Sequence, residues 1–61
     1  MPFSIGSAVQ IINHSEPNCN GQYGTIEKIE VAYDGYTRYY SVRLEDSDQL
    51  CVCTDDEVME A

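Results

Sequence analysis

The segment 21–29, Gly-Gln-Tyr-Gly-Thr-Ile-Glu-Lys-Ile, constrains the fold of this chain more than any other segment. Gly21 and Gly24 stand where a strand must turn sharply, because glycine adopts backbone angles that other residues avoid. The alternating run 40–44 is typical of a strand. The ending 54–58 supplies a capping residue for one helical turn. These features predict an all-β chain, folded as a small five-stranded barrel with one short C-terminal helical turn.

Turn-forming residues divide the 61 residues into short elements that form a single domain, 1–61. The longest loop is expected at 13–21, and Asp34-Gly35 predicts a hairpin turn. A single helical turn is expected over 55–59. Strands are expected at 8–12, 24–31, 37–44 and 49–54.

Residue parity predicts which side chains face the core. Ile26 and Ile29 have opposite parity, so a bulge between them is needed to bring both inward. In the third strand one face carries Tyr40, Val42 and Leu44. In the fourth strand we expect Leu50 and Val52 to face inward and the two cysteines to lie on the opposite face.

The three cysteines predict no secreted disulfide scaffold, because they cannot all pair within one chain and no apolar leader precedes the strands. Cys51 and Cys53 project from the same face about 7 Å apart, too far for an unstrained bond to each other. A zinc site built from both, with Cys19 and His14, is one alternative. The alternative that we favour is small apolar fillers, with no metal and no cofactor. The chain is accordingly expected in the cytoplasm.

Eleven acidic residues against three basic ones give a formal net charge of -8. This charge keeps a small protein soluble, or it forms an acidic face that recognises a basic surface. Direct binding to nucleic acid is disfavoured, because affinity for phosphates comes from Lys and Arg. No apolar run approaches the ~20 residues that a membrane-spanning helix needs.

Motifs made mostly of fold-determining glycines and core residues lie at Gly6 to Ile11, Asn20 to Ile29, Tyr40 to Leu44 and Asp55 to Val58. Through these motifs the chain resembles the SH3-like barrels of the KOW type, and it is similar to the variable chain of ferredoxin-thioredoxin reductase and to the S subunit of the photosynthetic NADH-dehydrogenase-like complex. The resemblance covers nearly the whole chain. It implies an SH3-like barrel and an accessory subunit that docks on something larger.

No catalytic constellation is visible, so an enzyme is not expected and no catalytic residue is assigned. The leading hypothesis is a non-enzymatic protein–protein interaction module, an accessory or regulatory subunit of a larger assembly. Its expected partner is another protein, and a partner with a basic surface would suit the acidic charge of this chain. An alternative is a small acidic inhibitor of the phage type that mimics nucleic acid and blocks a basic site on a nucleic-acid enzyme. The candidate partner-binding residues are Tyr33, Tyr36, Arg38 and Tyr39 on one side, and Asp55, Asp56 and Glu57 on the other.

Overall fold

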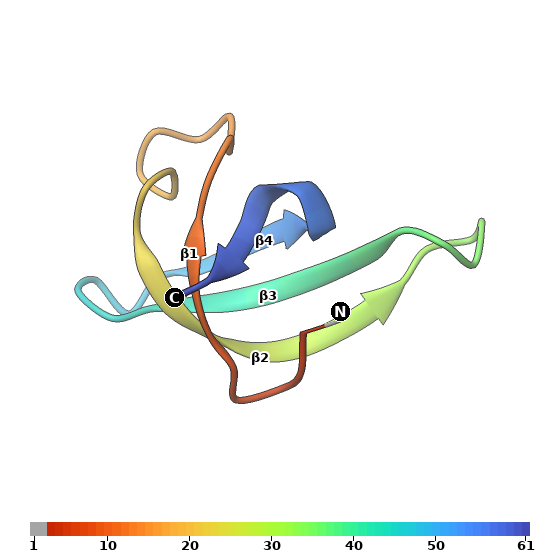
Figure 1. The fold of residues 1–61 in the computed structure, drawn as a ribbon. Helices are drawn as coiled ribbons and strands as arrows, with labels where there is room; N and C mark the ends of the chain where they lie inside the picture. Colours follow the sequence, from red (N-terminus) through yellow and green to blue (C-terminus); the bar gives the residue numbers. More distant parts are fainter. Residues whose placement is uncertain (1–2) are drawn as a thin grey trace.

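The computed structural model describes residues 3–61 and contains five strands and one 3-10 turn (Figure 1). Within these residues there is no α-helix, as the all-β prediction requires. None of the described helical segments is long and apolar enough to cross a membrane. The elements are β1 (Ala8–Ile11), β2 (Tyr23–Val31), β3 (Arg38–Leu44), β4 (Leu50–Thr54), the 3-10 turn η1 (Asp55–Glu57) and β5 (Val58–Glu60).

All strands belong to one antiparallel sheet with the order β4-β3-β2-β1-β5. The edge strands β4 and β5 are not paired with each other, so the sheet is open rather than closed by hydrogen bonds. It is nevertheless strongly bent, since buried side chains from β1 and β5 pack with those from β3 and β4. Figure 1 shows β1 and β5 lying across the longer β2–β3 pair.

A bulge in β2 lies where parity required it. The register between β2 and β3 shifts between Ile26 and Lys28, so Glu27 is the additional residue. Ile26 is thereby buried, and Ile29 packs against the edge of the core. The bulge also aims the Glu27 carboxylate at Arg43 on β3, which donates to it from Nε and Nη2 at 3.0 Å each.

Gly24 is required by close packing rather than by an unusual backbone angle. It is not among the residues with positive φ, whereas Gly21 is, at 83°. A Cβ atom on Gly24 would lie 2.5 Å from the carbonyl oxygen of Arg43 and 2.7 Å from Cγ1 of Val42. The glycine therefore lets β2 approach β3 over the core.

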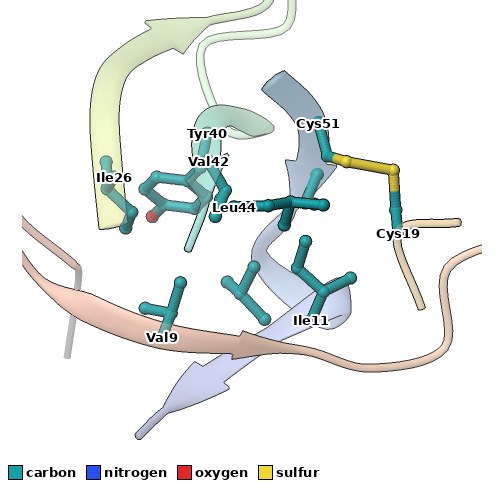
Figure 2. Close-up of a cluster of buried hydrophobic side chains, with 10 residues drawn as sticks. Val9, Ile11, Cys19, Ile26, Tyr40, Val42, Leu44 and Cys51 are labelled. Atoms are coloured by element: carbon teal, nitrogen blue, oxygen red, sulfur yellow. A yellow bond between two sulfur atoms is a disulfide. The ribbon is translucent and has the colours of Figure 1, made fainter. Parts of the chain in front are cut away.

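The core is a single cluster between the two halves of the bent sheet (Figure 2). As predicted, it contains the inward face of β3. The prediction for β4 is wrong: Leu50 and Val52 are exposed, and the cysteines of that strand are buried. Cys51 pairs across from buried Val42 and Cys53 from buried Tyr40, so the register fixes which side chains point inward. The buried set is Val9, Ile11, Cys19, Ile26, Tyr40, Val42, Leu44, Cys51, Cys53 and Val58.

In the C-terminal segment the helical turn is shorter than predicted, and a strand follows it. The 3-10 turn covers only Asp55–Glu57, and Thr54 caps it. The carboxylate of Glu57 accepts a hydrogen bond of 2.9 Å from the backbone N–H of Thr54. Val58 then returns to extended backbone, and β5 pairs with β1 through Val9, Gln10 and Ile11. The predicted turn over 55–59 thus contains the start of the fifth strand.

A disulfide joins Cys19 in the long loop to Cys51 on β4, and the two Cα atoms are 6.3 Å apart (Figure 2). This corrects the prediction that the cysteines serve only as apolar fillers. The parity error in β4 hid the bond, because an outward Cys51 would have no partner. The four-ligand zinc alternative is also wrong for this form of the protein, since two of its thiols are consumed.

Candidate functional site

The β2–β3 hairpin extends beyond the rest of the sheet and carries the predicted tyrosines (Figure 1). Tyr33 is fully exposed, Tyr36 is 85% exposed and Tyr39 is 39% exposed. Val31, at the end of β2, adds 58% of its surface to the same region. Tyr33 and Tyr36 bury almost nothing within the chain, so their apolar area is available to a partner, whereas Tyr39 offers only part of its surface.

The tip of this hairpin is held by one carboxylate. Asp34 accepts hydrogen bonds from the backbone N–H groups of Tyr36 and Thr37 at 2.8 and 2.9 Å, and from the Thr37 hydroxyl at 2.8 Å. These donors hold the pKa of Asp34 below its usual value, and the hydrogen bond from the Thr37 N–H has the largest effect. Gly35 completes the turn with a φ of 76°. The hairpin signal Asp34-Gly35 is confirmed, and the turn presents Tyr36 in a defined position.

A shallow groove lies beside the turn of the hairpin, lined by Val31, Ala32, Tyr33 and Tyr39. It brings two of the predicted tyrosines together and adds two apolar residues that sequence reasoning did not select. Val31 escaped notice because it reads as an ordinary strand residue. Its position opposite Arg38, at the last pair of the β2–β3 ladder, leaves it uncovered.

The predicted acidic residues lie in η1, and two of the three have structural tasks. Asp55 accepts a hydrogen bond of 2.6 Å from the hydroxyl of buried Tyr40. Glu57 accepts from the backbone of Thr54. Asp56 has no hydrogen bond or ion pair within the described part of the chain and is exposed.

The two predicted surfaces adjoin instead of lying on opposite sides. Tyr39 on the hairpin pairs in register with Thr54, the residue that precedes η1. The acidic turn therefore begins one residue from the cross-strand neighbour of an aromatic candidate. An aromatic groove and an acidic rim are neighbours in this structure.

Most of the basic charge is neutralised within the chain. Arg43 pairs with Glu27 and approaches Asp48 at 4.0 Å, and Lys28 lies 3.5 Å from Glu30. Arg38 has no ion pair among residues 3–61 and is half-buried near the hairpin. Of the predicted site it is the one cation, and it stands beside Tyr39.

The third cysteine is buried and free, and it has neighbours with metal-binding atoms. Ligand atoms of His14, Cys53 and Glu57 lie within 4.8 Å of one another. Burial, followed by the nearby carboxylate of Glu57, raises the pKa of the Cys53 thiol to about 11. A thiol that stays protonated at neutral pH is a poor nucleophile, so thiol exchange at Cys53 is not supported.

No protein-family model, no curated protein and no solved structure matches this chain.

Proposed function

We propose that this chain is a non-enzymatic protein–protein interaction module that acts as an accessory or regulatory subunit of a larger assembly. Its contact surface is the tyrosine hairpin, defined here as Val31, Tyr33, Tyr36, Arg38 and Tyr39. The observation that carries the proposal is the exposure of Tyr33 and Tyr36 on a turn that Asp34 holds in place. Tyrosine is one of the residue types enriched at the hot spots of protein interfaces, because it buries much area at little conformational cost.

The partner that suits this surface has an apolar centre and a basic rim. The groove beside Tyr39 is apolar, while Glu30, Asp34 and Asp56 around it are exposed acids. Complementary charge at the rim steers the encounter and raises the on-rate. We therefore propose a protein with Lys or Arg around an apolar projection.

The same proposal covers the fold family. The bent five-stranded sheet with its 3-10 turn before the last strand is the arrangement expected of an SH3-like small barrel. The proposed KOW-type resemblance is one of architecture. The nucleic-acid role of basic members of that group does not extend to a chain with a net charge of -8.

The nucleic-acid mimic receives less support from the position of the carboxylates. A mimic needs acids spaced like phosphates along one face, and here six of them have partners within the chain. Those six are Glu27, Glu30, Asp34, Asp48, Asp55 and Glu57.

The disulfide bears on where the protein works. Disulfides persist in oxidising compartments and are rare in the cytosol. The cytoplasmic placement remains a prediction. If it holds, Cys19 and Cys51 are reduced in part of the population.

The proposal is tested by quantitative capture from a native extract. The wild-type protein is compared with a Tyr33→Ser/Tyr36→Ser variant and with Tyr23→Ser as a matched control. Tyr23 is also about half exposed but lies at the opposite end of β2. We expect at least one protein to be retained by the wild type and the control, and to be lost from the hairpin variant.

Equal capture by all three proteins would contradict the assignment of the hairpin. Retention of a DNA- or RNA-handling enzyme that nucleic acid displaces, with no effect of the hairpin variant, would support the mimic instead.

A further inference from the structure

Three side chains with metal-binding atoms converge from three separate segments. His14 comes from the loop after β1, Cys53 from β4 and Glu57 from η1, and their ligand atoms lie within 4.8 Å of one another. Cys53 and Glu57 follow His14 by 39 and 43 positions in the sequence. The three side chains meet only because the sheet is bent. Cys53 is fully buried, and the other two are half-buried at the surface.

The loop that carries His14 is tied down at several points. The backbone N–H of His14 donates to Oδ1 of Asn20 at 3.0 Å. Nε2 of the His14 ring lies 3.0 Å from the carbonyl oxygen of Val52. The N–H of Glu16 donates to Nδ1 at 3.0 Å, which makes Nδ1 the acceptor and places the ring proton on Nε2. The Cys19–Cys51 disulfide anchors the same loop to the strand that bears Cys53.

Glu57 is positioned by its own turn. One carboxylate oxygen accepts from the Thr54 N–H, which leaves the second oxygen free to bind elsewhere.

We propose that His14, Cys53 and Glu57 form a binding site for a divalent zinc ion. One sulfur, one imidazole nitrogen and one carboxylate oxygen are a donor set that zinc accepts, at about 2.0 to 2.3 Å from the metal. Tetrahedral coordination at these lengths places the donors roughly 3 to 4 Å apart. Ligand atoms that lie within 4.8 Å of one another therefore need to approach by at most roughly 1 to 2 Å when the metal binds. Water fills the fourth position, because the site opens to solvent beside Glu57.

Binding exchanges existing bonds for new ones. The thiol of Cys53 loses its proton to solvent as the sulfur–zinc bond forms. The imidazole gives up its Glu16 hydrogen bond if Nδ1 binds the metal, and it gives up both the Glu16 and the Val52 bonds if Nε2 binds, because the ring proton then moves to Nδ1. This exchange makes the site weaker than a structural zinc site with four ligands, and it makes occupancy reversible.

The test is a titration of the disulfide-intact protein with cobalt(II), a coloured substitute for zinc. We expect one equivalent of cobalt to produce a thiolate-to-cobalt charge-transfer band and visible bands of tetrahedral cobalt, and zinc to remove both. Cys53→Ser is expected to abolish the charge-transfer band. Glu57→Gln and His14→Gln are each expected to weaken cobalt binding by at least about 10-fold.

Asp56→Asn is the matched control, because it removes a neighbouring acid of the same turn that has no place in the cluster. A one-dimensional proton NMR spectrum of each variant checks that it is folded. Glu57→Gln keeps a side-chain oxygen that can accept from the Thr54 N–H. A band that persists in Cys53→Ser, or equal losses in Asp56→Asn and Glu57→Gln, would overturn the proposal.

A second variant examines the loop. In Cys19→Ser/Cys51→Ser the tether is removed without adding thiols that bind metal. We expect cobalt affinity to fall while the charge-transfer band at saturation persists, since Cys53 remains. Loss of the charge-transfer band in this variant, while it remains folded, would mean that Cys53 is not the sulfur ligand.

Discussion

The hydroxyl of Tyr40, a buried residue of β3, donates a 2.6 Å hydrogen bond to Oδ1 of Asp55 in the 3-10 turn. The ring of Tyr40 also meets that of Phe3 edge to face, with 5.5 Å between centroids. One side chain thus connects the N-terminal segment, the core and the acidic turn. Asp55, predicted as a partner contact, is exposed and also accepts this hydrogen bond within the chain.

Tyr40→Phe is expected to lower the free energy of unfolding by about 1 kcal/mol, because the ring packing stays while the hydrogen bond to a charged acceptor is lost. Urea unfolding at pH 7 measures this difference. An unchanged midpoint would show that the bond contributes nothing to stability.

Alkaline pH should narrow the stability difference between the same two proteins. Burial, followed by the Asp55 carboxylate, raises the pKa of Tyr40 above its ordinary value of 10.0, and Arg38 opposes this in part. The folded state therefore retains the phenol proton more strongly than the unfolded state does. This contribution is complete below the unfolded pKa and is lost as pH rises through the folded pKa. Unfolding curves from pH 9 to pH 11 should show a steeper loss for the wild type than for Tyr40→Phe, and parallel losses would refute the coupling.

Gly24→Ala should destabilise by about 2 kcal/mol or more, since its Cβ would meet the Arg43 carbonyl and the Val42 side chain. Gly35→Ala is the matched control. No atom lies within 4 Å of its new Cβ, and only its φ of 76° opposes the change. The control should cost about 1 kcal/mol. Thermal unfolding compares the two, and an equal or smaller effect at Gly24 would mean that β2 can move away from β3.

The Cys19–Cys51 bond, with a sequence separation of 32, should contribute about 4 kcal/mol through the restriction of the unfolded chain. A core of this size supplies roughly 3 to 5 kcal/mol without a staple. Reduction should therefore leave a folded protein that has lost about half of its stability and melts at a clearly lower temperature. Circular dichroism with and without a reductant measures this, and an unchanged melting temperature would show that the bond is not formed or not needed.

The sequence predicted the elements well where residue patterns repeat. Alternation gave the inner face of β3, and the opposite parity of Ile26 and Ile29 gave the bulge in β2. It failed in β4, because Leu-Cys-Val-Cys is apolar on both faces and parity alone cannot choose between them. The choice depends on pairing with β3, which is a tertiary fact.

The structure divides the predicted site residues into two groups, those that are free for a partner and those that bind within the chain, and the sequence alone could not show this division. Tyr33, Tyr36 and Tyr39 are exposed as expected, whereas Asp55 and Glu57 bind within the chain. Neighbouring acids look alike in a sequence, and only the position of Tyr40 and the turn distinguishes Asp55 from Asp56. For this reason charge removal at the rim is best tested with Asp56→Asn alone, which leaves the turn intact.

The central claim is that the tyrosine hairpin binds the partner. It is tested most directly by amide hydrogen exchange of this protein alone and in complex with the captured partner. The account predicts that added protection concentrates in residues 31–39, with weaker effects at Asp56. Protection confined to 55–60, with the exchange of residues 31–39 unchanged, would contradict it.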